Sequence, residues 1–126
     1  MTSPHPSQPI GSQGETLVCD YLITQGWQVI ARQWRSRWGE IDIVACQGSR
    51  LIFVEVKTRQ VNSWDQGGRQ AVDQRKQDKI ARTSSFFLSQ HPAYAEYDCQ
   101  FDVALVEIHP KQLKLREYIP HAFELS

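Results

Sequence analysis

The sequence predicts an α/β fold in which helices pack on a mixed central sheet. Segments with helical and strand periodicity follow one another in the order helix, three strands, helix, two strands. Short loops join the first three strands, so these strands can form an antiparallel meander. The long second helix permits a crossover that places the fourth strand parallel to the third.

The length and composition of the chain fit a single compact domain. Its 126 residues are too few for two domains of ordinary size, and 40% of them are hydrophobic. We expect a disordered tail over residues 1–10, which carry three prolines, and one domain over residues 11–126. The tail lacks both a basic residue and an apolar run, so we do not expect it to be a secretory signal.

The same composition disfavours several classes of protein. No stretch approaches roughly 20 consecutive apolar residues, so we expect neither a membrane span nor a membrane partner. The three cysteines show no Cys-x-x-Cys pattern, and reduced thiols in a cytoplasmic protein are the simplest interpretation. The net charge is zero, but residues 31–82 hold eleven basic residues against six acidic ones. This local surplus permits a phosphate-bearing partner.

The first half of the chain reads as a helix followed by three strands. The helix covers residues 12–25, where apolar side chains recur at helical spacing, and Gly26 suits its end. Residues 27–34 read as the first strand. Two further strands, residues 39–45 and 51–57, are separated by a short turn and are expected to form a hairpin.

The second half continues with a helix and two strands. Residues 59–68 form a polar loop that ends in two glycines. The second helix covers residues 69–90 and ends where a proline follows His91. Residues 100–108 form a strand with one apolar face, and residues 112–119 return beside it.

The hairpin carries charge inside runs of strand-forming residues. The hydrophobic pattern favours a register with Asp42 opposite Glu55 and Glu40 opposite Lys57, although a shift by two residues stays open. Two ionised carboxylates on opposed residues, roughly 5 Å apart, repel by roughly 3 kcal/mol at an effective dielectric constant near 20. A bound cation, a shared proton or, in part, Lys57 would offset this repulsion.

Two carboxylates and a lysine around one point suit metal-assisted attack of water on a phosphodiester. The alternative for these residues is a solvated sheet face with ordinary salt bridges. For Glu40, a cross-strand ion pair with Lys57 is the expected role, and support of the metal ligands without binding the metal is the alternative. For Glu15, the pattern Ser12-x-x-Glu15 fits a capping box, which does not exclude a role in a site.

The series Glu15, Asp42 and Glu55-Val56-Lys57, within this order of elements, resembles the PD-(D/E)XK nuclease superfamily. Its arrangement looks closest to the archaeal Holliday junction resolvases. More narrowly, the chain resembles the YraN-like uncharacterised bacterial family from about residue 10 to the end. The matching segments are Gly14-Glu15, Tyr21-Leu22, Trp34-Arg35, residues 39–45, residues 53–59, Lys76-Gln77 and Phe101-Asp102-Val103.

The resemblance implies a restriction-endonuclease-like αβββαββ fold, with a mixed central sheet flanked by helices. It implies that Asp42 and Glu55 bind a metal, magnesium or manganese, and that the carbonyl of Val56 adds a ligand. Glu15 would reach the same metal directly or through water. Lys57 would position the nucleophilic water or stabilise the transition state.

Two positions depart from the pattern of the superfamily. Ile41 stands where the motif's proline would precede the aspartate, which is a frequent change. Gln33 stands where related chains often have asparagine, so the role of that position is left open.

Basic and aromatic residues surround the candidate site in sequence. The residues expected to contact nucleic acid are Arg35, Arg37, Arg59, Lys76 and Lys79. Trp34 and Trp38 would either stack on unpaired bases or fill the edge of the core. For the stripe of Arg75, Lys79 and Arg82 on the second helix, a solvated face is the default alternative.

The leading hypothesis is a metal-dependent endonuclease-like protein that hydrolyses DNA phosphodiesters, with branched or single-stranded DNA as candidate substrates. The alternative is a non-catalytic module that keeps the nuclease fold to bind nucleic acid or protein. A third reading is an adaptor that forms a homodimer through an exposed strand or its tryptophans. The presence of all four motif residues, Glu15, Asp42, Glu55 and Lys57, favours catalysis.

Overall fold

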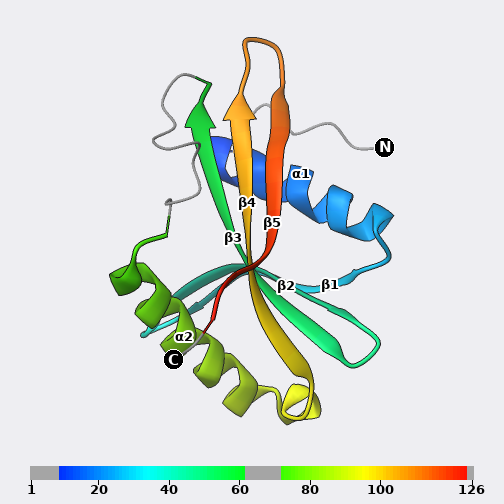
Figure 1. Ribbon diagram of the computed structural model, residues 1–126, viewed down its shortest axis with the longest axis vertical. Helices are drawn as coiled ribbons and strands as arrows, with labels where there is room; N and C mark the ends of the chain where they lie inside the picture. The colour runs from blue at the N-terminus through cyan, green and yellow to red at the C-terminus, as the bar shows by residue number, and fades with distance from the viewer. Residues whose placement is uncertain (1–8, 62–71, 125–126) are drawn as a thin grey trace.

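The computed structural model describes residues 9–61 and 72–124 and confirms the expected order of elements (Figure 1). The predicted tail up to residue 8, and the predicted loop and helix start over residues 62–71, lie outside the described residues. The elements are α1 (Ile10–Thr24), β1 (Gln28–Ser36), β2 (Gly39–Gln47), β3 (Arg50–Gln60), α2 (Gln74–Gln90), the short 3-10 helix η2 (Pro92–Tyr94), β4 (Asp98–Ile108) and β5 (Leu113–Phe123).

The five strands form one mixed sheet in the order β1-β2-β3-β4-β5. Strands β1, β2 and β3 pair antiparallel as a meander. Strand β4 then lies parallel to β3, and β5 returns antiparallel to β4. The predicted meander and the predicted parallel crossover through α2 are both confirmed, which establishes an α/β fold of αβββαββ topology.

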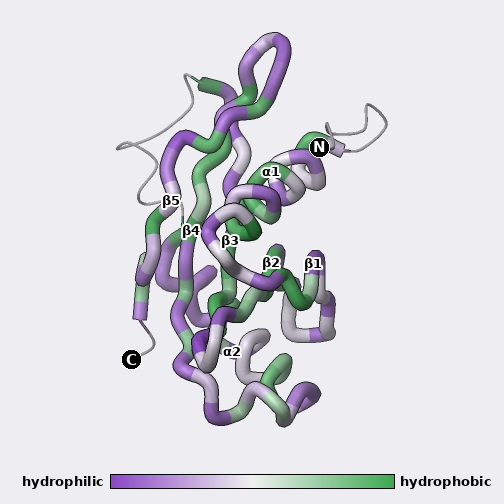
Figure 2. Tube along the Cα trace, turned by 90° about the vertical axis from the view of Figure 1, so that its right-hand side faces the viewer, coloured by the Kyte–Doolittle hydropathy of each residue, from purple (hydrophilic) through white to green (hydrophobic). Residues whose placement is uncertain are grey.

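The helices cover opposite faces of the sheet. Ile52 packs with α1, whereas its neighbour Phe53 packs with α2, because successive side chains of a strand point to opposite faces. Figure 1 shows α1 beside one end of the strongly twisted sheet and α2 beside the other. The apolar stretches of β2 and β3 lie between the two helices (Figure 2). These two strands are therefore buried on both faces near their middle.

Both helix starts differ from the sequence-based expectation. Helix α1 begins at Ile10, so Ser12 lies inside its first turn and cannot act as its N-cap. The capping-box alternative for Ser12 and Glu15 is therefore wrong, and Ile10, which was expected in the tail, belongs to α1. In α2 the N-cap is Asp73, whose side chain accepts a hydrogen bond from the Lys76 amide at 2.9 Å. An aspartate is among the residues that best satisfy the free amides of a helix start.

Two further expectations concern thiols and membranes. Cys19, Cys46 and Cys99 are all free, as their spacing predicted. Within residues 9–61 and 72–124, neither helix has the length and apolarity needed to cross a bilayer.

Candidate metal centre

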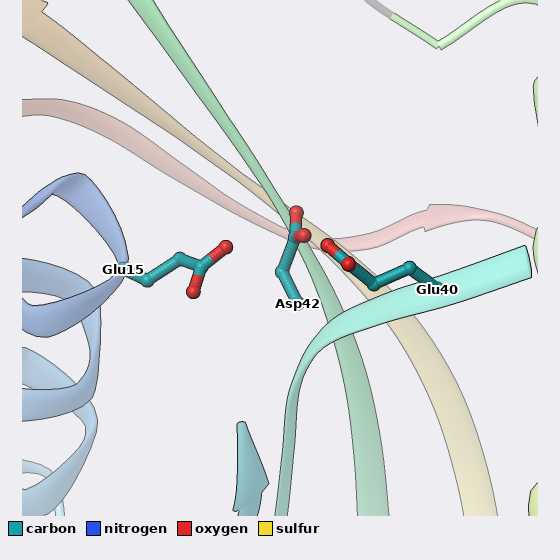
Figure 3. A group of neighbouring side chains, drawn as sticks. All are labelled: Glu15, Glu40 and Asp42. Carbon is teal, nitrogen blue, oxygen red and sulfur yellow. The ribbon is translucent and has the colours of Figure 1, made fainter. Parts of the chain in front are cut away.

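Three carboxylates from two elements meet beside the sheet. Glu15 comes from α1, and Glu40 and Asp42 come from β2. Each offers one oxygen, and these oxygens all lie within 4.8 Å of one another. Figure 3 shows Glu15 and Glu40 pointing toward Asp42 from opposite sides. We refer to Glu15, Glu40, Asp42 and the adjacent Glu55 as the acidic group.

The acidic group forms where β2 and β3 separate. The pairing of these strands runs from Gln47↔Arg50 to Ile43↔Val54, which is the register that the hydrophobic pattern predicted. Asp42 and Glu55 would be the next pair in this register, but the hydrogen-bonded ladder ends before them. Instead, Asp42 Oδ2 accepts a hydrogen bond from the Val56 amide at 2.7 Å. The side chain takes the place of a backbone acceptor, and the two strands diverge.

Asp42 and Glu55 are nevertheless close enough to interact strongly. Burial raises the pKa of Asp42 to about 9, and the hydrogen bond with Glu55 and the negative charge of Glu55 act in the same direction. Glu55 is itself buried, with 8% of its surface exposed. At neutral pH, and without a cation, Asp42 therefore retains its proton, because two ionised carboxylates cannot share so small a space.

Glu15 reaches the group because α1 approaches β3 closely. A Cβ atom on Gly14 would collide with the Thr58 hydroxyl of β3, so any larger residue would force Thr58 or the helix to shift. The next residue, Glu15, is only 7% exposed, and its Oε1 atom is buried without a hydrogen-bond partner among the described residues. Burial raises the pKa of Glu15, while hydrogen bonds with Gln33 and Asp42 oppose this rise.

Gln33 is a site neighbour whose role the sequence left open. It lies between the pairs Arg32↔Ile43 and Trp34↔Ile41 of the β1–β2 ladder, which places it beside Asp42. Its φ of 47° is in the left-handed region, which is uncommon for a residue other than glycine. The Gln33 amide donates a hydrogen bond to Ser12 Oγ at 2.8 Å and also interacts with Glu15. Gln33 thus links β1 to the inner side of α1.

Glu40 has a different partner from the one predicted. Its Oε2 atom lies 2.6 Å from Arg35 Nε, across the Arg35↔Glu40 pair of β1 and β2. The expected ion pair with Lys57 is therefore replaced by one with Arg35, because the antiparallel β1 presents that guanidinium directly opposite. Sequence analysis left a supporting role open for Glu40 but did not predict that its carboxylate lies together with those of Glu15 and Asp42. The two-residue spacing from Asp42 was the available signal.

Two lysines converge on Glu55. Lys76 of α2 lies with its Nζ atom 2.9 Å from Glu55 Oε2. Burial lowers the pKa of Lys76. The hydrogen bond to Glu55 and the negative charge of Glu55 outweigh this effect, so the pKa of Lys76 lies above its usual value. Burial, followed by the charge of Lys76, lowers the pKa of Lys57. Lys76, predicted only as a nucleic-acid contact, thus lies at the acidic group itself.

The remaining predicted basic residues contact groups outside the acidic group. Arg37 lies over the ring of Trp38, at the turn between β1 and β2. Lys79 of α2 packs its aliphatic chain close to Gly39, at the start of β2. Arg59 is exposed and donates a hydrogen bond to the carbonyl of Thr58 at 3.2 Å.

Asp102 is a buried carboxylate with a structural role. It accepts hydrogen bonds from the Gln100 side chain at 3.0 Å, from the Tyr118 hydroxyl at 2.5 Å and from the His121 amide at 3.1 Å. Tyr118 and His121 belong to β5, whose pairing with β4 is irregular at this point. Asp102 therefore holds β5 to β4 where the ladder is interrupted.

The fold and the site together define a class: an α/β domain of αβββαββ order, with carboxylates from its first helix and two central strands beside a lysine. The chain belongs to the uncharacterised protein family UPF0102, the YraN family, whose model matches residues 14–106. The resemblance to a YraN-like family is thus confirmed.

Several family members are similar to this chain over most of its length. A UPF0102 protein of Synechococcus sp. (strain JA-3-3Ab) is 52% identical over 122 residues, which cover 94% of this chain and 93% of the relative. A UPF0102 protein of Nostoc sp. is 45% identical and covers 91% of this chain and 94% of its own length. A third, of Gloeobacter violaceus, is 48% identical over 90% of this chain and 91% of the relative.

Among solved structures, Pyrococcus furiosus SfsA in complex with Ca²⁺ is similar to this chain at a TM-score of 0.39 and 13% identity. The match covers 86% of this chain and 62% of SfsA, so this chain spans less than two thirds of that protein.

Proposed function

We propose that this chain is a metal-dependent nuclease that hydrolyses DNA phosphodiesters at the acidic group. The observation that carries the proposal is the crowding of Asp42 against Glu55 and Glu15, with Lys57 two residues beyond Glu55 on β3. Carboxylates on three separate elements are unfavourable neighbours unless a cation or a proton lies between them. Their convergence beside a lysine is an arrangement suited to metal-assisted hydrolysis of a phosphodiester by water.

The residues present fit a hard divalent cation. All side-chain donors are carboxylate oxygens, which magnesium and manganese prefer. The partnerless Oε1 atom of Glu15 is a second sign of fit, because a buried acceptor without a donor is costly and a cation would satisfy it. The raised pKa of Asp42 is a third, because a cation would replace the proton that this carboxyl now keeps.

Each residue has a distinct part in the proposed reaction. Asp42 and Glu55 would hold the metal, with the carbonyl of Val56 as a further ligand and Glu15 reaching it from α1. The bound ion would supply Lewis-acid chemistry by lowering the pKa of water and polarising the phosphate. Lys57 would orient the attacking water and stabilise the charge that develops on the phosphate oxygens.

Lys76 would have a part that depends on the state of Glu55. In the structure its ammonium neutralises Glu55 at 2.9 Å. When Glu55 binds the metal, Lys76 would contact a phosphate oxygen of the DNA instead, because an ammonium group is a suitable partner for a phosphate. Arg35 forms an ion pair with Glu40 and is exposed beside the acidic group. It would contact the DNA backbone at a phosphate further from the cut than the one that Lys76 contacts.

A cleavage assay tests the proposal directly. The full chain is incubated with single-stranded, flapped, branched and blunt DNA, and with RNA, in Mg²⁺ or Mn²⁺. We expect cleavage of at least one DNA substrate that EDTA abolishes and that Asp42→Ala and Lys57→Ala each reduce by about a hundredfold or more. Glu96→Gln, which neutralises an exposed carboxylate outside the acidic group, is the matched control and should cut normally.

The same assay distinguishes a nuclease from a non-catalytic binding module. If the wild-type chain cuts no substrate above the level of Asp42→Ala, the nuclease proposal is wrong. Retained DNA binding without cleavage would then favour the non-catalytic module.

A further inference from the structure

Trp38 differs from the neighbouring Trp34 in what surrounds its ring. The Trp34 ring packs edge-on against Phe87, with the ring centroids 5.2 Å apart, and belongs to the core on the α2 face. Trp38 lies in the turn between β1 and β2, half-buried, with two guanidinium groups over its ring. The central carbon of Arg37 is 4.8 Å from the ring centroid, and that of Arg82 is 5.6 Å away. Both arginines are exposed.

The backbone around Trp38 is held in place. The Trp38 amide donates a hydrogen bond to Ser36 Oγ at 3.0 Å, which closes the turn. Gly39 follows with a φ of +145°, and a Cβ atom there would lie only 2.9 Å from Thr83 Oγ1 and 3.0 Å from Lys79 Cε. The turn is therefore fitted closely against α2. Its indole ring is presented from a fixed position, which lowers the entropy cost of binding a partner.

A row of cations on α2 connects this ring with the acidic group. Lys76, Lys79 and Arg82 follow one another at intervals of three residues, so they lie on neighbouring turns of one side of the helix. Their contacts mark the path: Lys76 lies at Glu55, Lys79 at Gly39 and Arg82 at Trp38. We call Trp38 and these three cations the Trp38 track. At 1.5 Å of rise per residue, its cations span about 9 Å along the helix axis.

The chemistry of the Trp38 track fits a single strand of nucleic acid. Cations in a row bind successive phosphates, and an aromatic ring at the end of the row offers a face on which a base stacks. A guanidinium over the ring occupies the same kind of face as a base. Because Arg37 and Arg82 are exposed, a base can displace either of them toward a phosphate at little cost. A base inside a duplex is already stacked and paired, so it cannot use the ring.

We infer that the Trp38 track binds an unpaired segment of DNA that leads away from the acidic group, with one base stacked on Trp38. The inference rests on the proposed function and narrows its substrate class to DNA with unpaired nucleotides adjoining the cut. Along a strand at 3.4 Å or more per nucleotide, the path corresponds to about three nucleotides or fewer. A flap, a branch or a free single strand meets this requirement, and a blunt duplex does not.

Binding without cleavage tests the inference. The full-length protein is titrated in EDTA with single-stranded, flapped and blunt DNA of matched length. We expect single-stranded and flapped DNA to bind more tightly than the duplex. We expect Trp38→Ala to weaken their binding by about tenfold or more, to leave duplex binding unchanged, and to be largely rescued in Trp38→Tyr, which keeps an aromatic face.

A base analogue locates the stacked nucleotide. With 2-aminopurine placed at successive positions of the flap, we expect fluorescence quenching at one position in the wild type and in Trp38→Tyr, but not in Trp38→Ala. Thermal unfolding of all three proteins shows that the change is not a loss of fold. Arg82→Ala should make the slope of log affinity against log salt concentration shallower by about the amount that one phosphate contact contributes.

Arg50→Ala is the matched control for Arg82→Ala. Arg50 also lies over a tryptophan ring, that of Trp27 at 5.1 Å, but it lies on β3 outside the Trp38 track. Arg50→Ala should leave unchanged both the affinity for DNA and the dependence of that affinity on salt.

The outcomes separate this inference from the proposed function. Equal binding of single-stranded DNA by the wild type and Trp38→Ala overturns the inference, even if Mg²⁺-dependent cleavage is found. An equal loss of duplex binding in Trp38→Ala also overturns it, as does the absence of binding to any DNA. Binding that depends on Trp38, in a protein that cuts nothing, upholds the inference and leaves the nuclease proposal to fail alone.

Discussion

The Asp42 carboxylate accepts a hydrogen bond from the backbone amide of Val56 at 2.7 Å, where the ladder between β2 and β3 ends. This one contact has two consequences. It satisfies an amide that the diverging strands would otherwise leave unpaired. It also fixes the Asp42 side chain between Glu55 and Glu15, so a structural hydrogen bond and a candidate metal ligand are the same carboxyl group.

We predict that Asp42→Asn separates stability from metal binding. At pH 8 the Asp42 carboxyl is mostly protonated, and the neutral Asn amide can likewise donate to Glu55 while its oxygen accepts from the Val56 amide, so the metal-free variant should be at least as stable as the wild type. Its affinity for Mg²⁺ or Mn²⁺ should fall by about tenfold or more, because an amide is a weaker ligand than a carboxylate. Thermal unfolding with and without metal measures both effects. A variant that is clearly less stable, yet binds metal normally, would contradict this assignment.

Metal binding should depend steeply on pH. Asp42 has a pKa of about 9 in the folded protein and 3.8 as its ordinary value, so it keeps a proton between these limits that a metal must displace. The apparent affinity should therefore rise by about tenfold per pH unit toward pH 9. Calorimetry in buffers of different ionisation enthalpy counts the released proton. An affinity that is constant between pH 6 and 8.5 would show that no proton is displaced.

The metal-free protein should show the opposite trend in stability. Between pH 4 and 9 the native state binds more protons at Asp42 than the unfolded state does, so the free energy of unfolding should fall as the pH rises. The Asp42 contribution is fully present below its unfolded pKa and is lost as the pH passes through the folded value. Urea unfolding across this range, with Asp42→Asn as the reference, isolates the contribution. A parallel dependence in the two proteins would contradict the prediction.

Gly14→Ala should destabilise the protein by about 1–3 kcal/mol, because the added methyl group collides with the Thr58 hydroxyl. Gly11→Ala in the same helix meets nothing within 4 Å and should be neutral or stabilising by up to about 1 kcal/mol, since alanine has the higher helix propensity. Removing the colliding hydroxyl in Gly14→Ala with Thr58→Ala should restore part of the loss. Denaturant unfolding measures all three, and equal effects at positions 11 and 14 would exclude the steric explanation.

Lys76→Met should tighten metal binding several-fold while reducing any cleavage. The ammonium competes with a cation for Glu55, so its removal frees that carboxylate. Lys79→Met, one turn further along α2, loses the same charge without this contact and is the control for general electrostatic effects. Weaker metal binding in Lys76→Met than in Lys79→Met would show that Lys76 supports the site in another way.

Asp102→Asn should reduce the free energy of unfolding by about 1–3 kcal/mol, because an amide cannot accept all three of the hydrogen bonds now made to the carboxylate. Tyr118→Phe should have a smaller effect of about 1 kcal/mol. Neither variant should change metal affinity in the folded protein. A loss of metal binding in Asp102→Asn at temperatures where it stays folded would place this residue in the site.

Much of the sheet was predictable because the alternation of apolar residues leaves few choices. The pairing of Ile43 with Val54 follows from keeping charge off the buried faces, and the structure has that register. The parallel pairing of β3 and β4 follows from the length of the chain between them. These features follow from the regular backbone of a sheet, and the periodicity of apolar residues in the sequence is set directly by that backbone.

The details of the site were less predictable because side chains depart from backbone regularity there. Nothing in the spacing of Asp42 reveals that its carboxylate replaces a ladder acceptor. The left-handed backbone of Gln33 and the partner of Glu40 depend on β1, whose register sequence analysis did not specify. The capping alternative for Glu15 was wrong because α1 already begins at Ile10, which places Ser12 inside the helix.

Because Glu15 comes from α1, while the other members of the acidic group come from the sheet, the site can be split between two segments of the chain. The exposed turn at Gln25 and Gly26 separates a short helical segment, which supplies one carboxylate, from the sheet that supplies the others. A chain cut at this turn would leave two fragments, neither of which holds the complete acidic group. Reassembly of such fragments could then be followed by the recovery of metal binding, which would make this small domain a candidate for split-protein complementation.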